Sequence, residues 1–563
     1  MPTIPASKVP VNTLLYGNNL PMLRQYIPDE CVDLHYLDPP FNSNRNYFVL
    51  FKDRTGKASE AQEAAFIDTW TWNEESEGAY RELQHDCPNQ DLAVTIVALR
   101  RILKETPMMA YLVAMAIRLV ELHRTLKPTG SLYLHCDPTA SHYLKIVLDV
   151  IFGPQNFRNE ITWKRTSAHS DAKHKWADVT DIILYYGKSP ATVFYPQYTA
   201  HDPAYVQDFY RHDDGDGRGL YRLGDMASPN PRPNLMYEWL GFPYPPKGWR
   251  YSQETMQKLH EECRINYPCR KDGTPDFTKR PALKRYLLEQ SGSLVPNVWT
   301  DIPPVQSKGE SLGYPTQKPL ALLERIILAS SQPGDVVMDS FCGCGTAVAA
   351  AQKLGRQWIG IDVTTIAVGI IKSRMEQAYP ELAGKIPVIG FPVDLEGARS
   401  LFETDPYSFQ EWASTLIGAY PLRKKGADGG IDGWLPFHDF DESSHRAVVQ
   451  VKGGKVQVGQ VRDFCHVVAR EKAALGFFLC MGDEGRTITQ PMKVEALKEG
   501  PWESVGGHCY PKVQILSIKD LLEGKAHPMF PPQDKRSLLG FKAAKQARPT
   551  GQMSAEQTLF AVD

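Results

Sequence analysis

The chain has 563 residues, of which 42% are hydrophobic and 23% charged, values that exclude a disordered chain and predict a globular protein of three or more domains. Its net charge of −2 neither supports nor excludes a nucleic-acid partner, because DNA responds to a local basic face and not to the sum. The ten cysteines lack the CxxC pairs of a zinc site and indicate thiols in a reducing cytosol.

Two apolar runs near the start of the chain predict buried strands. Residues 14–16 precede the turn Gly17-Asn18, and residues 32–37 precede the segment Asp38-Pro39-Pro40-Phe41. Buried parallel strands are apolar, and α/β proteins place their sites beyond the carboxyl ends of these strands. We therefore expect the Asp38 segment to lie at a crevice, together with a glycine-rich turn about 300 residues later, at residues 339–346.

The next elements continue an α/β pattern. Residues 108–122 are the most apolar stretch, but they are too short to span a bilayer and include Arg118 and Glu121, so no membrane association is expected. An amphipathic helix is predicted over residues 111–127, ended by Pro128 to Gly130. Strands are expected over residues 131–135 and 181–186.

Residues 160–300 differ in amino-acid composition from the segments around them. Basic and aromatic residues alternate there with proline and glycine, as in Trp163-Lys164-Arg165, Lys247-Gly248-Trp249-Arg250-Tyr251 and Lys284-Arg285-Tyr286. This pattern suits a DNA groove reader with phosphate contacts, and the alternative is a solvated insertion with a small core of its own.

A glycine-rich turn follows a third buried strand, predicted at residues 335–338. The turn runs Asp339-Ser340-Phe341-Cys342-Gly343-Cys344-Gly345-Thr346, and it leads into a helix over residues 347–354 and a strand over 358–361 that ends at Asp362. The glycines let the backbone approach a ligand, and an acid after the second strand suits a ribose. Val348 stands where a dinucleotide fold has its third glycine, which favours S-adenosylmethionine (SAM) over NAD. The two cysteines are expected to fill the loop and not to bind metal.

Together these segments resemble the SAM-dependent DNA methyltransferases that methylate exocyclic amines, over roughly residues 12–393. The Asp38 segment looks like their catalytic D-P-P-[YF] motif, and the glycine turn looks like their F-x-G-x-G motif. The order, with the catalytic motif first, is that of the permuted β class. Tyr314-Pro315-Thr316-Gln317-Lys318-Pro319 resembles the family segment that holds the methionine end of SAM, and Asn18 stands at the family's cofactor-side turn.

The resemblance implies a Rossmann-like fold, SAM as cofactor and double-stranded DNA as partner. An exocyclic amine becomes a better nucleophile when acceptors draw on its N–H protons. Asp38 and the carbonyl of Pro39 are the expected acceptors, Pro40 stiffens the turn, and Phe41 offers a face for a flipped base. Adenine N6 is the favoured target, because aspartate begins the motif and phenylalanine ends it; cytosine N4 is the alternative. His135 either contacts the base or a phosphate, or is a packed, hydrogen-bonded histidine.

A second set of motifs occupies the C-terminal third. A helix is predicted over residues 409–417, Asp432 begins a strand, and residues 446–452 form a second strand with Gln450 and Lys452 at its end. A helix over 458–472 and strands over 475–480 and 512–516 follow. This pattern resembles the Mrr-type restriction endonucleases, a PD-(D/E)xK branch in which glutamine often replaces the second acid.

That resemblance implies a Mg²⁺-dependent nuclease of α/β fold. Asp432, Gln450 and Lys452 match its three positions, and Glu411 is a fourth candidate. Residues two apart on a strand face the same side, so Gln450 and Lys452 point together. Asp432 and Gln450 are the expected Mg²⁺ ligands. The alternative is a domain that only binds DNA, which would leave an orphan methyltransferase.

The predicted organisation is therefore a methyltransferase domain at residues 1–393, with its target-recognition region at about 160–300, a nuclease-like domain at 394–530 and a flexible basic tail at 531–563. The last residues, Gln557 to Phe560, faintly resemble a sliding-clamp-binding peptide. The resemblances imply a cytoplasmic, nucleoid-associated protein of bacterial or phage type. Whether it is a monomer or a homodimer stays open.

Overall fold

The structure is a computed structural model that describes residues 11–40, 45–52, 58–68, 70–167, 176–305, 310, 316–422, 429–441, 443–483 and 488–532, with backbone only for 45–52 and 58–68. Phe41, the segment 311–315 and nearly all of the expected tail lie outside these residues. Residues Pro196–Pro296 form a compact unit of their own, distinct from the chain on either side of it.

A nine-stranded sheet forms the centre of the first part of the chain. Its spatial order is β13 (Val298–Trp299), β6 (Phe157–Lys164), β7 (Thr180–Gly187), β5 (Leu126–Cys136), β2 (Val32–Leu37), β14 (Val336–Asp339), β15 (Gln357–Asp362), β1 (Thr13–Tyr16) and β16 (Val388–Ile389). The strands from β5 to β16 pair in parallel, whereas β7 runs antiparallel to both β5 and β6. The predicted Rossmann-like α/β fold is confirmed.

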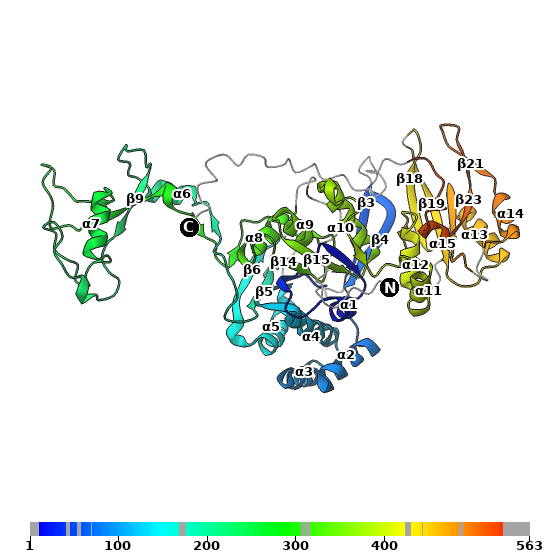
Figure 1. Cartoon of the computed structure of the whole chain (residues 1–563), viewed down its shortest axis with the longest axis horizontal. Helices are drawn as coiled ribbons and strands as arrows, with labels where there is room; N and C mark the ends of the chain where they lie inside the picture. Colours follow the sequence, from blue (N-terminus) through cyan, green and yellow to red (C-terminus); the bar gives the residue numbers. More distant parts are fainter. Residues whose placement is uncertain are drawn as a thin grey trace. The chain divides into compact units, whose positions relative to one another are not determined.

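Helices cover both faces of this sheet (Figure 1). On one side lie α8 (Leu320–Ser330), α9 (Thr346–Lys353) and α10 (Thr365–Ala378), and on the other α1 (Asn19–Tyr26), α4 (Pro107–Thr125) and α5 (Pro138–Phe152). Two further helices, α2 (Glu74–His85) and α3 (Gln90–Leu103), pack against α4. The core between α4, α5 and the sheet is aliphatic, as the pattern of buried strands predicts.

The boundary between helix α4 and strand β5 lies nearer the start of the chain than the sequence predicts. The helix ends at Thr125 and β5 begins at Leu126, although the pattern indicated helix to residue 127 and a turn to Gly130. Pro128 cannot continue a helix, and its missing N–H is tolerated here because the register of β5 against β2 shifts between Leu126 and Ser131. Val388–Ile389 form β16, a short strand that pairs with β1 at the edge of the sheet. Strands β3 (Arg45–Lys52) and β4 (Ala58–Asp68) form a hairpin that the sequence did not predict.

The unit Pro196–Pro296 has its own small core. Strands β10 (Ile265–Asn266), β11 (Ala282–Tyr286) and β9 (Tyr221–Asp225) form an antiparallel sheet, and β8 (Tyr198–Thr199) pairs with β12 (Ser293–Leu294). Helices α6 (Pro203–Phe209) and α7 (Gln253–Glu261) flank them (Figure 1). Trp239, Trp249 and Met256 are buried among other apolar residues there.

The C-terminal part is built on a five-stranded sheet. Its order is β17 (Tyr420–Pro421), β18 (Gly433–His438), β19 (Ser444–Lys452), β20 (Leu475–Cys480) and β23 (Val513–Ser517), with a separate ribbon of β21 (Pro501–Glu503) and β22 (Cys509–Pro511). The helices are α11 (Leu395–Thr404), α12 (Pro406–Thr415), α13 (Val458–Arg470), α14 (Gln490–Leu497) and α15 (Ile518–Leu522). Apolar clusters fill both faces of the sheet. Within the described ranges, no helix is both long and apolar enough to cross a membrane.

Candidate methyl-transfer and nuclease sites

Four neighbouring strands of the nine-stranded sheet end in polar side chains at one edge. Asp38 follows β2, Asp339 ends β14, Asp362 ends β15 and Asn18 follows β1. These residues line one cavity of about 380 Å³, a size typical of small-molecule sites. The predicted Pro39, Pro40, Thr316, Lys318, Phe341, Gly343 and Thr346 line it as well.

Asp38 is held by a lysine far away in sequence. The Lys318 ammonium donates to both carboxylate oxygens of Asp38, at 2.7 and 2.6 Å. The side chains of Lys318 and Asp38 are only 8% and 18% exposed, so this ion pair is shielded from water. Thr316, two residues earlier, has a φ of 64°, a strained conformation for a β-branched residue. Through its two hydrogen bonds, Lys318, which is predicted to bind the cofactor, also positions Asp38, the predicted catalytic acid.

The glycine loop is shaped by backbone conformation and by one carboxylate. Gly343 and Gly345 have φ values of 51° and 74°, which glycine adopts at little cost. Asp362 accepts the N–H of Gly343 at 2.8 Å, and its other oxygen accepts the N–H and hydroxyl of Thr364 at the start of α10. Asp362 thus anchors the loop. Gly345 does not line the cavity: it caps α9 and faces Ile371.

Asp339 sits at the bottom of the cavity in an environment that disfavours its charge. It is almost fully buried, and burial raises the pKa of its carboxyl to about 8, with the nearby Asp38 adding to the effect and the N–H of Phe341 opposing it. The cavity therefore holds one carboxylate paired with Lys318 and a second carboxyl group that is largely protonated at pH 7.

Arg118 enters the site from α4. Its guanidinium donates to the side-chain oxygens of Asn19, at 2.6 Å, and of Asn18, at 3.0 Å. Asn19 in turn donates to the carbonyl of Ser340 in the glycine turn. Burial lowers the pKa of Arg118, but an arginine stays charged at any physiological pH. Arg118 therefore ties the turn after β1 to the glycine turn and brings a positive charge to the cavity wall.

A buried polar chain lies behind Asp38. The Tyr36 hydroxyl is 3.0 Å from Nδ1 of His135, and Nε2 of His135 is 3.0 Å from Asp181, which also pairs with Arg165. Burial raises the pKa of Tyr36. Burial also acts to raise the pKa of Asp181, but the hydrogen bond and charge of His135, with the charges of Lys318 and Arg165, outweigh it and lower that pKa. Of the two alternatives for His135, the structure supports the packed, hydrogen-bonded one, and Tyr36 is the member that lines the cavity.

Several lining residues were not predicted from the sequence: Tyr36, Asn19, Trp70, Met115, Arg118, Gln317, Leu323, Val363 and Thr364. Two buried polar atoms of the lining, the Trp70 indole nitrogen and the Ser340 hydroxyl, have no hydrogen-bond partner among the residues that the structure describes. Buried polar groups are normally satisfied, so these two atoms indicate a place for a polar ligand.

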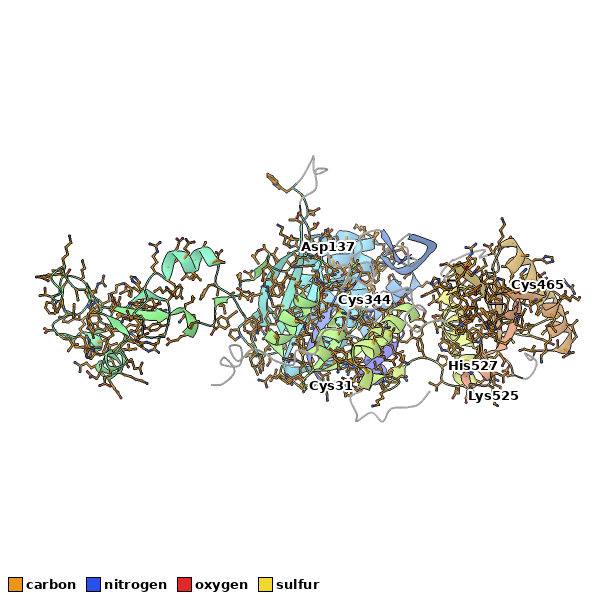
Figure 2. All side chains as sticks on the ribbon, turned by 90° about the horizontal axis from the view of Figure 1, so that it is seen from above. Cys31, Asp137, Cys344, Cys465, Lys525 and His527 are labelled. Atoms are coloured by element: carbon orange, nitrogen blue, oxygen red, sulfur yellow. The ribbon has the colours of Figure 1, made fainter. Side chains whose placement is uncertain are left out.

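The two loop cysteines pack as predicted. Cys342 and Cys344 are buried, and burial raises the pKa of both thiols. The Cys342 thiol contacts the backbone of Asp339, and Figure 2 shows Cys344 within the body of the nine-stranded part. Protonated, buried thiols of this kind are poor metal ligands.

The second predicted site lies on the five-stranded sheet. Asp432 precedes β18 and accepts the N–H of Val451 on β19 at 2.8 Å. Gln450 donates its amide nitrogen to the carbonyl of Gly430 at 3.0 Å, which leaves its amide oxygen as an acceptor. Asp432, Gln450 and Glu411 on α12 are each less than 10% exposed. The strand pairing thus brings Asp432 beside the end of β19 that carries Gln450 and Lys452.

This arrangement supplies few anionic ligands. No group of three or more His, Cys, Asp or Glu residues suited to a metal ion occurs in the part of the chain that the structure describes. A Mg²⁺ ion keeps several waters and needs only one or two carboxylates, so an aspartate with an amide oxygen is a workable but weak set of ligands.

Two family models match the chain. The model described as DNA methylase, of the N6/N4 type, matches residues 32–373, and the model described as restriction endonuclease, of the Mrr catalytic type, matches residues 401–496. The first match includes the Asp38 turn, the glycine loop and all of the cavity lining except residues 17–19, and the second contains Glu411, Asp432, Gln450 and Lys452.

Among similar proteins, type II methyltransferase M.EcaI of Enterobacter cloacae is 31% identical over 47% of this chain and 57% of its own length. The Mod subunit of the type III restriction-modification enzyme StyLTI of Salmonella typhimurium is 25% identical over 63% of this chain and 52% of its own. The chain thus spans little more than half the length of either relative.

Solved structures with a similar arrangement include the cytosine-N4-specific PvuII DNA methyltransferase and the M1.HpyAVI–SAM complex. The first is 12% identical, with a TM-score of 0.32, over 67% of this chain and 94% of its own. The second is 15% identical, with a TM-score of 0.29, over 64% of this chain and 98% of its own.

Proposed function

Because this chain belongs to the N6/N4 DNA methylase family and carries an Mrr-type restriction endonuclease domain, we propose that it methylates an exocyclic amine in double-stranded DNA. Adenine N6 is the favoured target and cytosine N4 the alternative. The observation that carries the proposal is the single cavity into which Asp38, the glycine turn and Asp362 all converge from adjacent strands.

The cavity suits SAM as the methyl donor. Its volume, its apolar side chains and the unsatisfied Trp70 and Ser340 atoms fit a ligand with both polar and apolar parts. Asp362 and Asn18 would hold the nucleoside end, and Thr316, Lys318 and Arg118 would hold the charged amino-acid end. Gly343 and Thr346 present backbone close to the ligand. When bound, SAM supplies an activated methyl group on a sulfonium centre.

Asp38 would orient the target amine and accept its hydrogen bond. Bound SAM would supply its methyl group to the amine nitrogen and leave as the neutral thioether, and Asp38 would accept the surplus amine proton and pass it to water. Lys318 would hold the Asp38 carboxylate in place before the amine arrives, and its contacts with both carboxylate oxygens must then loosen. Phe41 would stack on the flipped base, and the unit Pro196–Pro296 would serve as the target-recognition region.

The test is Asp38→Ala in the full chain. We expect methyl transfer to fall by about 10² or more, because the group that accepts the amine proton is lost, while SAM affinity changes little. Transfer of labelled methyl to DNA and calorimetric SAM titration separate the two effects.

Digestion of the product to nucleosides then distinguishes N6-methyladenine from N4-methylcytosine. As a matched control, Asp33→Asn removes a carboxylate from the same strand at the far end from the cavity. Undiminished transfer by Asp38→Ala would refute the assignment of the site.

We further propose Mg²⁺-dependent cleavage of DNA by the C-terminal domain. The supporting observation is the packing of Asp432 beside the end of β19, with Gln450 and Lys452 two residues apart on one side of the strand. Asp432 and the Gln450 amide oxygen would bind the ion, Lys452 would face the attacked phosphate or its water, and Glu411 would support the ligands.

Cleavage is tested with unmodified and modified DNA in Mg²⁺, with and without SAM. We expect Asp432→Ala to abolish it, because the only anionic ligand of the predicted pair is removed, whereas Asp441→Asn in an exposed turn should not change it. If the wild type cuts neither DNA and Asp432→Ala alters only affinity, the domain is a DNA-binding module.

A further inference from the structure

Two arginines face each other across the sheet of the unit Pro196–Pro296. Arg222 on β9 and Arg285 on β11 are directly opposite partners in the antiparallel register. Directly opposed residues project from the same face with Cβ atoms about 5 Å apart, and like charges in such positions are destabilising. The sequence thus places two positive charges at opposed positions of the sheet, where two opposite charges or two neutral residues would be more stable.

Neither arginine is compensated by an acid. In the described ranges no carboxylate pairs with either guanidinium, and the Nε atom of each is buried without a hydrogen-bond partner. Four other cations of the unit have acid partners: Arg218 pairs with Asp216, Arg264 with Glu289, Lys279 with Asp276 and Lys284 with Asp214. A buried donor of a charged group is costly to leave unsatisfied, and no carboxylate that the structure describes neutralises the two charges of this pair, so an anion bound there would be stabilised.

The surroundings hold both side chains in place. A Cβ at Gly224 would lie 2.7 Å from Nε of Arg285, so the Arg285 side chain lies across this glycine. The guanidinium carbon of Arg222 lies 6.0 Å from the ring centroid of Tyr210, at the limit of a cation–π contact. Guanidinium groups do not lose their protons, so both charges persist at every relevant pH.

We propose that Arg222 and Arg285 together bind one phosphate group of the DNA backbone. A guanidinium offers parallel N–H donors that match phosphate oxygens, and two of them on one face would enclose an anion and remove their mutual repulsion. A phosphate contact fixes the register of a protein on DNA without reading sequence. The proposal rests on the proposed function only in taking DNA as the source of the phosphate; free phosphate offers the same chemistry.

The test compares the full chain with the double variant Arg222→Gln/Arg285→Gln. Binding of several duplexes of different sequence is measured over a range of salt concentrations. Because each neutralised phosphate contributes about 0.9 to the slope of log affinity against log salt, we expect the slope to become shallower by about 1 for every duplex. Lys279→Gln is the matched control: it also removes one cation of the unit, but one already paired with Asp276, and should leave the slope unchanged.

Thermal melting without DNA separates binding from folding. Relief of the repulsion should leave the double variant at least as stable as the wild type, and inorganic phosphate should raise the melting temperature of the wild type more than that of the variant. If the double variant shows the same slope of log affinity against log salt as the wild type, the proposal is overturned. This holds even if inorganic phosphate stabilises the wild type, because the arginine pair would then bind free phosphate but not DNA. Methyl transfer is measured in a separate assay. If the salt dependence of DNA binding differs between wild type and double variant as expected, but the wild type methylates no DNA, only the proposed function is contradicted and the phosphate site stands.

Discussion

At the scale of single residues, contacts between side chains that lie far apart in the sequence determine the geometry of the cavity. Lys318 and Asp38 are 280 positions apart, and no local pattern predicts their contact. The residues of the two motifs could be found, because a turn after an apolar strand is visible in sequence. Arg118 left a weaker signal, a charge inside a long and largely apolar helix, which indicates a polar partner within the fold. Tyr36 could not be found, since its position in the pattern is that of one more apolar residue of a buried strand.

The raised pKa of Asp339 makes the stability of the folded protein depend on pH, and its direction fixes the sign of that dependence. Its folded pKa of about 8 lies above its ordinary value, so the folded state binds more protons than the unfolded state between about pH 4 and 8. The wild type therefore loses stability as pH rises through this window, by up to about 1.4 kcal/mol per pH unit.

The Asp339→Asn variant lacks this titration. We expect its melting temperature to exceed that of the wild type by a margin that grows from pH 5 to pH 8 and then levels off. Thermal unfolding at a series of pH values provides the measurement. A margin that shrinks as pH rises would contradict the assignment.

At the scale of elements, apolar runs bounded by turn residues were predicted best. The bounds of β2 and β20 match the runs at 32–37 and 475–480. Strand β20 is continuously apolar, β2 is interrupted only by Asp33 and His35, and both are flanked by polar or turn residues. The start of β5 was placed wrongly, since the helical periodicity continues past Thr125 and only pairing with β2 ends it. The hairpin of β3 and β4 was missed, because residues 58–65 are rich in alanine and glutamate, which favour helix.

The junction of the glycine turn with α9 offers a test at this scale. Gly345 has a left-handed backbone, and an added Cβ would lie 2.6 Å from Ile371 on α10. Gly345→Ala should therefore destabilise the protein by about 1–2 kcal/mol or more and weaken SAM binding, because the loop must shift.

Gly369 on α10 is the matched control for this substitution. A Cβ there meets nothing within 4 Å, so Gly369→Ala should be neutral or stabilise the helix by about 0.5–1 kcal/mol. Melting temperature and SAM affinity are compared for the two variants. Equal effects would show that the backbone conformation of Gly345 is unimportant.

At the scale of the whole molecule, the chain carries its N6/N4 DNA methylase match and its Mrr-type restriction endonuclease match on separate sheets. If the proposed nuclease acts on unmodified DNA, the methyl mark protects the host from the same polypeptide. Cells that express Asp38→Ala should then grow poorly, because their DNA is cut and not marked, and the double variant Asp38→Ala/Asp432→Ala should restore growth. Growth curves and single-molecule sequencing of cellular DNA measure both effects. Equal growth of all variants would argue against a nuclease that the mark restrains.

The strand order also bears on how the protein is made. Strand β2 lies between β5, which soon follows it, and β14, which begins about 300 residues later; β1 has no partner until β15. At about 5–20 residues per second, a ribosome needs roughly 15–60 s to cover that distance. During this time the nascent chain carries an open edge at the centre of its future sheet, a surface prone to pairing with other chains. We infer that synthesis of this chain depends on shielding that edge, and that messages truncated before residue 336 yield aggregates and not a smaller folded protein.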